Sequence, residues 1–88
     1  MVIMLSLAAE NNMTIRVKFF ASLREDISNP NTEVDSALAK TVAEVWGQAT
    51  DHPMPPHVLC SVNLEHTDTT HAVNDGDEVA FFPPITGG

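Results

Sequence analysis

Residues 74–84 read NDGDEVAFFPP, and this stretch predicts a turn, a strand and two prolines that end the strand. Asn, Asp and Gly crowd residues 74–77, which predicts a tight turn. Residues 78–82 follow as a strand, in which successive side chains point to opposite faces. Pro83 and Pro84 have no backbone N–H to donate to a neighbouring strand. The sheet must therefore end there, and an extended segment should follow it.

A first strand is predicted near the other end of the chain. Apolar residues alternate there with basic ones, because Ile15, Val17 and Phe19 are separated by Arg16 and Lys18. A period of two residues is typical of a strand with one face in the core and the other in solvent.

Two capping boxes predict helices. Residues 22–25 read SLRE, which predicts a short helical turn that runs to Ile27. Residues 41–44 read TVAE, and the apolar residues that follow have helical spacing, so the main helix should span residues 42–49. Its continuation is forbidden by three prolines: Pro53, Pro55 and Pro56.

The intervening segments predict the remaining strands. A turn at residues 29–31 should lead into a second strand over residues 32–38, although residues 37–40 could equally begin the helix. Residues 58–62 read VLCSV and predict a third strand. The polar residues 65–72 suggest either an edge strand or a loop. The sequence thus predicts an α+β fold, in which a mixed sheet of four to five strands packs on one main helix.

A chain of 88 residues has room for one domain. We expect residues 13–82 to form it and residues 83–88 to form an extended tail. Met13 looks like a second translation start. Residues 1–12 share no sequence pattern with the domain that follows. We interpret them as a dispensable N-terminal extension, since chain ends tolerate change.

The charge balance disfavours two classes of partner. The chain has 12 acidic residues against 4 Lys and Arg, for a net charge of -8. Such a surface repels phosphate backbones and anionic lipids, so neither nucleic acid nor membrane is expected as a partner. A partner with a basic surface would instead be attracted.

The sequence favours a cytoplasmic location. Cys60 is the sole cysteine and cannot form an intrachain disulfide, which fits a reducing compartment. No stretch approaches the roughly 20 apolar residues that span a bilayer. The apolar residues 2–9 are not preceded by a basic residue, so we expect no secretory signal.

No set of side chains indicates an enzyme that acts alone. Cys60 lies in an apolar strand, and Trp46 lies on the apolar face of the helix, so both are expected in the core. We expect the acidic residues around the turn only to solvate it: Asp75, Asp77 and Glu78. The histidines lack the close spacing of metal ligands and are expected on the surface: His52, His57, His66 and His71. Catalysis should therefore belong to a complex, and we expect neither a metal nor a bound cofactor.

Two phenylalanines are expected outside the core. If Val79 and Phe81 face the helix, Phe82 lies on the open face of the sheet, and Phe20 begins to point outward in the same way. Should the first and last strands be neighbours, these two rings form an exposed aromatic patch beside the tail. Such patches often bind partners, although one ring could instead fold over the sheet edge.

The tail suggests a reactive chain end. Ile85 and Thr86 offer side chains that a partner could grip, whereas Gly87 and Gly88 could thread a narrow channel. A carboxylate becomes reactive once another protein converts it to an acyl-adenylate with ATP. Sulfur can then displace AMP and leave a thiocarboxylate at Gly88.

Three segments resemble the small subunits of molybdopterin synthase, which are ubiquitin-like β-grasp sulfur carriers. Residues 75–88 closely resemble the C-terminus of that family. Residues 15–21 with residues 23–25 look like its first strand and turn, and residues 62–63 match the end of an internal strand. His66 departs from the pattern, because the family commonly has an apolar interface residue there.

This resemblance implies a fold and a reaction cycle. The fold would be β-grasp, with the first and last strands parallel in the middle of the sheet. An E1-like enzyme would adenylate Gly88, and sulfuration would give the thiocarboxylate. The tail would then enter the large catalytic subunit and donate sulfur to cyclic pyranopterin monophosphate, in a heterotetramer of two small and two large subunits. Partner contacts would be made by Phe20 and Phe82, together with the tail residues Pro83, Pro84, Ile85 and Thr86.

Other functions are compatible with the same features. A β-grasp sulfur carrier for thiamine synthesis or tRNA thiolation also ends in Gly-Gly, as does a protein modifier that forms isopeptide bonds. A non-catalytic binding module could carry Gly87 and Gly88 without using them.

Overall fold

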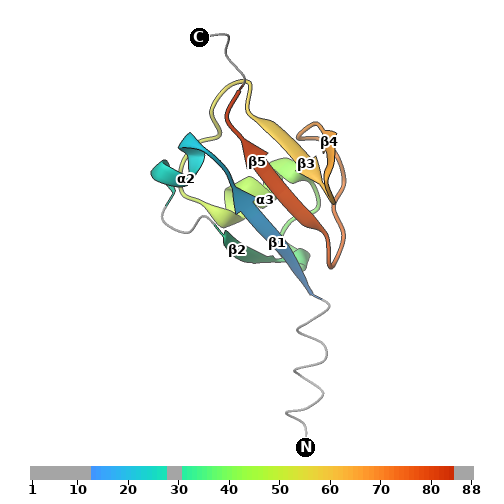
Figure 1. Cartoon of the computed structure of the whole chain (residues 1–88). Helices are drawn as coiled ribbons and strands as arrows, with labels where there is room; N and C mark the ends of the chain where they lie inside the picture. Colours follow the sequence, from blue (N-terminus) through green and yellow to red (C-terminus); the bar gives the residue numbers. More distant parts are fainter. Residues whose placement is uncertain (1–12, 28–30, 85–88) are drawn as a thin grey trace, which may run out of the picture.

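The computed structural model describes residues 13–27 and 31–84. Within these residues, five strands form one mixed sheet in the order β2-β1-β5-β3-β4. Helix α3 lies against one face of the sheet, and Figure 1 shows it behind the strands. The strands are β1 (Thr14–Phe19), β2 (Asn31–Asp35), β3 (Leu59–Val62), β4 (Glu65–Thr67) and β5 (Glu78–Phe82). The helices are α2 (Ser22–Asp26), the 3-10 turn η1 (Ser36–Leu38) and α3 (Val42–Ala49).

The first and last strands lie side by side in the middle of the sheet. β1 and β5 run parallel, with Arg16 opposite Glu78 and Phe19 opposite Phe81 (Figure 1). The other strand pairs are antiparallel. This arrangement confirms the α+β class, and it confirms the parallel central pair that the family resemblance implied.

Three aromatic rings fill the space between the sheet and α3. The Phe19 and Phe81 rings stack with centroids 5.6 Å apart. Trp46 meets both rings edge-on, at 5.4 Å from Phe19 and 4.9 Å from Phe81. Each such pair contributes roughly 0.5–1.5 kcal/mol beyond the apolar area that it buries. The Trp46 indole also donates a hydrogen bond to the His52 carbonyl at 2.7 Å, so its polar atom is satisfied within the core.

The start of α3 confirms the N-cap at Thr41, whereas the reciprocal bond of the predicted capping box is made to the residue before it. The Thr41 hydroxyl accepts a hydrogen bond from the N–H of Glu44 at 3.3 Å. The Glu44 carboxylate reaches back and accepts the N–H of Lys40 at 2.6 Å. The N–H of Val42 donates to the His71 carbonyl, so the loop after β4 also caps this helix. The first N–H groups of a helix have no partner inside it, and here neighbouring groups satisfy several of them.

The second strand is shorter than predicted. It ends at Asp35 rather than at residue 38, and the next three residues form η1. The cause is local, because the Asp35 carboxylate accepts the N–H of Ala37 at 2.9 Å and turns the chain away from the sheet. The alternative that the helix begins within residues 37–40 is also wrong, because α3 begins at Val42.

The first capping box is wrong, although the helix that it predicted exists. Ser22 is the first helical residue, so the N-cap position belongs to Ala21, which has a φ of 56° and makes no side-chain capping bond. The helix ends at Asp26, and Ile27 follows it in extended conformation. Asn31, predicted in a turn, instead begins β2.

The two remaining strand predictions need small corrections. The third strand begins at Leu59 rather than at residue 58. The polar residues 65–72 contain both of the predicted alternatives, because β4 ends at Thr67 and a loop follows. Ala72 in that loop pairs with Thr41 across an isolated bridge.

Candidate functional site

The face of the sheet opposite α3 is the open face, and it carries the candidate site. Residues that lie directly opposite one another on neighbouring strands point to the same face. Lys18 pairs with Ala80, Ala80 with Ser61, and Ser61 with His66. These four residues therefore form one row across the open face, from β1 to β4.

The next row contains an aromatic stack. The rings of Phe20 and Phe82 lie nearly parallel, at an angle of 8° and with centroids 5.1 Å apart. Phe20 is 38% exposed, and Phe82 is half-buried. The N–H of Phe20 donates to the Phe81 carbonyl at 3.0 Å, which extends the pairing of β1 with β5 by one residue. The structure thus confirms that both rings lie together on the open face.

Two further side chains border this stack. Leu59 pairs with Phe82 from β3 and is half-buried. The His66 ring lies 5.8 Å from the Phe82 ring and tilts by 43° toward it. We call these four residues the aromatic patch: Phe20, Leu59, His66 and Phe82. Aromatic side chains are enriched at protein interfaces, so the patch is suited to docking.

Small residues lie beside the aromatic patch. Ala80 and Ser61 occupy the centre of the open face, yet each is only 4% exposed. Their larger neighbours in the same row, Lys18 and His66, stand on either side of them. Neighbouring side chains therefore cover the small residues in the middle of the open face, with a lysine on one side and a histidine on the other.

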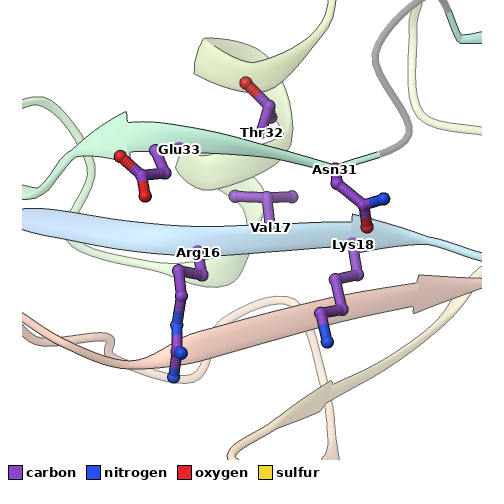
Figure 2. Close-up of a pocket in the computed structure, with 6 residues that line it drawn as sticks. All are labelled: Arg16, Val17, Lys18, Asn31, Thr32 and Glu33. Atoms are coloured by element: carbon purple, nitrogen blue, oxygen red, sulfur yellow. The ribbon is translucent and has the colours of Figure 1, made fainter.

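The basic end of the open face holds two ion pairs with one acceptor. Glu78 lies 3.6 Å from the Lys18 ammonium and 3.7 Å from the Arg16 guanidinium. Figure 2 shows both basic side chains reaching from β1 over β5, while Glu33 and Asn31 lie on the β2 side of a shallow depression. Exposed ion pairs of this kind stabilise a fold by only about 0–1 kcal/mol, so their main effect is to shape the charge of this face.

The acidic residues at the turn before β5 do more than solvate it. The Asp77 carboxylate accepts hydrogen bonds from the Asn63 amide at 3.0 Å and from the Asn74 N–H at 2.8 Å. Asp75 accepts the hydroxyl of Ser36, and Glu78 makes the ion pairs described above. The prediction for these three carboxylates is therefore wrong. Apart from Asn74, which belongs to the same turn, the partners are distant in sequence, so the local pattern gave no sign of them.

The tail begins where β5 ends. Pro83 and Pro84 follow Phe82 directly, and both are half-buried. They place the start of the tail next to the aromatic patch. The other predicted tail residues lie outside the described part of the chain, so what was predicted for them stays a prediction: Ile85, Thr86, Gly87 and Gly88.

Cys60 belongs to the core, as predicted. It is 2% exposed, and its thiol donates a hydrogen bond to the Thr67 carbonyl at 3.3 Å. Burial raises the pKa of this thiol, and the negative charge of Asp68 raises it further. A nucleophilic cysteine needs the opposite shift, because the thiolate is the reactive form.

The histidines lie on the surface as predicted, since all four are exposed: His52, His57, His66 and His71. Over residues 13–27 and 31–84, we find no cluster of three or more His, Cys, Asp or Glu side chains that could hold a metal ion. In the same residues, no helix is long and apolar enough to cross a membrane.

A second depression lies on the other side of the molecule. Trp46 contributes to its wall together with Leu23 and Ile27 from the α2 region and with His52, Pro53 and Pro55 from the proline-rich loop. It gathers apolar side chains and a single titratable group. The chemistry that catalysis needs is not assembled there.

Comparison with known proteins identifies relatives over most of the chain. The ThiS family matches residues 17–88. The molybdopterin synthase sulfur carrier subunit of Escherichia coli (strain K12) is 39% identical over an 83-residue alignment, which covers 84% of this chain and 99% of that protein.

Solved structures share the fold. The crystal structure of SAMP1 from Haloferax volcanii is 27% identical and has a TM-score of 0.69, covering 85% of this chain and 99% of that one. The complex of subunits 1 and 2 of molybdopterin-converting factor from Helicobacter pylori 26695 contains a similar chain. That chain is 21% identical with a TM-score of 0.59, and the match covers 86% of this chain and 100% of that one, which is a likeness of fold.

The sequence match and the structural match agree on the β-grasp arrangement. The family match covers both the open face and the tail, since it begins in β1 and reaches residue 88. The E. coli relative is matched over almost its whole length. This chain therefore belongs to the ThiS family, in which it is related to the molybdopterin synthase sulfur carrier subunits.

Proposed function

We propose that this chain is the sulfur carrier subunit of a molybdopterin synthase. The observation that carries the proposal is the position of the aromatic patch, directly beside the point where the tail leaves β5. A partner that docks on the patch receives the tail at a fixed place. The proposal is supported by the similarity to a sulfur carrier subunit of that name and by a family match that runs through residue 88.

The chemistry takes place at the Gly88 carboxylate. An E1-like enzyme binds ATP, and the carboxylate attacks the α-phosphorus, so pyrophosphate leaves and an acyl-adenylate forms. A sulfur nucleophile then attacks the acyl carbon, displaces AMP and leaves a thiocarboxylate. The thiocarboxylate is ionised at neutral pH and is a better nucleophile than the original carboxylate. This chain needs no catalytic side chain of its own, because its partners supply the groups that activate and use the terminus.

The tail fits this task through its composition. Pro83 and Pro84 favour an extended and fairly stiff start, which projects the chain end away from the sheet. Ile85 and Thr86 give the partner side chains to grip. Gly87 and Gly88 have no side chains, so they pass through a narrow channel and bring the terminus close to the reacting atoms.

The partner that uses the sulfur is the large catalytic subunit. The tail enters its active site and donates sulfur to cyclic pyranopterin monophosphate, which builds the dithiolene that later holds molybdenum. Two small and two large subunits form the working assembly. The net charge of -8 favours a partner with a basic surface and speeds the encounter with it.

Mass spectrometry of the intact protein tests the carrier role. The chain is incubated with its activating enzyme, ATP and a sulfur source, beside a variant that lacks Gly88. We expect the wild-type mass to rise by the difference between one sulfur and one oxygen atom, and the variant mass to stay unchanged. Addition of the large subunit and cyclic pyranopterin monophosphate should then return the original mass. If a proven active enzyme leaves the wild-type mass unchanged, the proposal fails.

A protein-modifying role is the second candidate, because the chain is 27% identical to a small archaeal modifier protein. In that case the activated Gly88 carbonyl is attacked by a lysine amine of another protein, which forms an isopeptide bond and releases the activating group. The same incubation, supplemented with a lysate of the source cells, distinguishes the two. Conjugates of higher mass that depend on Gly88 would favour the modifier role over the carrier role.

A further inference from the structure

His66 is the one titratable side chain of the aromatic patch. Its ring lies 5.8 Å from the Phe82 ring, and its pairing with Ser61 places it on the open face. The side chain is exposed, so water solvates it in the free chain. A partner that covers the Phe82 ring also reaches this imidazole, because a standard interface buries about 800 Å² on each side.

The carboxylates on either side of His66 in the sequence are directed elsewhere. Glu65 pairs with a buried core residue of β3, so its side chain points to the opposite face of the sheet from His66. The Asp68 carboxylate accepts hydrogen bonds from the hydroxyl and the N–H of Thr70, and the positive charge that acts on it is that of His71. A proton on His66 therefore gains no ion pair from its own strand.

The strands beside β4 do not supply an ion pair either. The residues that face His66 from β3 and from the end of β5 are uncharged, since they belong to the aromatic patch or are the small residues beside it. The Glu78 carboxylate of β5 lies 3.6 Å from Lys18 and 3.7 Å from Arg16. Both of these basic residues belong to β1, on the far side of β5 from β4, and α3 covers the opposite face.

The charge of an imidazole matters once a partner excludes water from it. An imidazole changes its charge between about pH 5 and pH 8. Water solvates both forms, whereas removal of the charged form from water is costly unless an anion lies against it. The partner expected for a chain with a net charge of -8 has a basic surface, which also repels a protonated ring. Docking therefore favours the neutral form of His66.

We propose that His66 links docking on the aromatic patch to protonation: the partner binds the chain with this imidazole neutral, and protonation of the imidazole weakens the complex. The inference rests on the proposed function, in which the partner is the large subunit. The free chain then binds more protons than the complex, so the affinity rises with pH through the range in which the ring titrates and is constant above it. A relative with an apolar residue at this position, which is common in the family that the sequence resembles, lacks this group.

Three histidine variants test the linkage. His66→Gln keeps a polar side chain without the titration, and His66→Leu makes the position apolar. His52→Gln is the matched control, because it removes the same titratable group from the proline-rich loop, away from the open face. Both histidines are exposed, so the variants should fold, which circular dichroism at each pH confirms before use. Isothermal titration with the large subunit, from about pH 7.5 to about pH 5.5, gives the dissociation constants.

We expect the wild-type affinity to fall by about 5- to 10-fold over this range, and His52→Gln to fall equally. Both His66 variants should lose most of this fall, and His66→Leu should bind at least as tightly as wild type at about pH 7.5. Titrations near pH 6.5 in buffers of different ionisation enthalpy add an independent readout. Wild type should release roughly half a proton per complex more than His66→Gln does.

Two outcomes would overturn the inference. One is an equal pH response of wild type and both His66 variants, which would show that docking leaves this imbalance of charge in water. The other is a wild-type affinity that rises as the pH falls, which would show that the partner holds an anion against the ring. Absence of any binding by the wild-type chain at any pH would instead overturn the proposed function, and this inference with it.

Discussion

Asn63, in the turn between β3 and β4, is hydrogen-bonded to Asp77 and Glu78 at the start of β5. Its side-chain amide donates to the Asp77 carboxylate at 3.0 Å, and its side-chain oxygen accepts the N–H of Glu78, also at 3.0 Å. Its backbone N–H donates to the Glu78 carbonyl at 2.8 Å. One residue thus joins the hairpin to the central strand through three hydrogen bonds.

Loss of the Asn63 side chain should therefore destabilise the whole domain. We expect Asn63→Ala to lower the free energy of unfolding by about 1–3 kcal/mol, because Asp77 and the Glu78 N–H both lose a partner. The φ of residue 63 is 51°, which Ala also tolerates poorly. Asn63→Gly removes the backbone contribution and keeps the loss of the side chain. Urea unfolding of both variants is the measurement, and wild-type stability in both would contradict this account.

The next residue in the same turn should respond in the opposite direction. Leu64 is 84% exposed and has a φ of 73°, a conformation that favours glycine in a two-residue hairpin turn. We expect Leu64→Gly to raise the free energy of unfolding by about 0.5–1 kcal/mol. Leu64→Ala is the matched control, since it removes the side chain but keeps the Cβ atom and should bring no such gain. Thermal unfolding of the pair decides the matter, and equal stability would show that the backbone is not strained there.

Truncation of one stacked ring should weaken docking without unfolding the chain. We expect Phe82→Ala to weaken binding of the large subunit by about 2 kcal/mol, which is roughly 30-fold. Leu38→Ala is a suitable control, because Leu38 is also apolar, is 58% exposed and lies in η1, away from the patch. Titration calorimetry measures both. Unchanged affinity for Phe82→Ala would show that the aromatic patch is not the docking surface.

One exposed carboxylate should make stability depend on pH. Hydrogen bonds from the Thr70 hydroxyl and then the Thr70 N–H lower the pKa of Asp68 below its ordinary value near 3.8. A lowered pKa in the folded state stabilises the fold above the ordinary value, and this stabilisation is lost as the pH falls through the folded pKa. Asp68→Asn should therefore be less stable than wild type at neutral pH, and the difference should shrink below about pH 4. Chemical denaturation across this range tests it, and a constant difference would count against the assignment.

Local pattern predicted the elements whose periodicity is strong. The apolar alternation of β1, the N-cap of α3 at Thr41 and the turn before β5 were found where they were expected. Several boundaries were wrong by one to three residues, and two of them show why periodicity does not fix where an element ends. The Asp35 carboxylate accepts a hydrogen bond from the N–H of Ala37, so β2 ends early. Ala21 rather than Ser22 occupies the N-cap position of α2.

The candidate site depended on knowledge that no local pattern supplies. Phe20 and Phe82 were each placed outside the core from strand alternation, but their contact requires β1 and β5 to be neighbours, which the resemblance implied and the structure confirmed. The shared use of Glu78 by two basic residues was not foreseen, because it depends on the register of that same strand pair.

The central position of β5 also governs how this protein is made. A ribosome releases β1 early and β5 late, yet the two strands must pair in the middle of one sheet. Until β5 emerges, β1 and β3 have no neighbour on their inner edges, and such edges attract other chains. A partner that binds Phe20 stacked on Phe82 therefore binds only the completed domain, because a chain that still lacks β5 cannot form this stack.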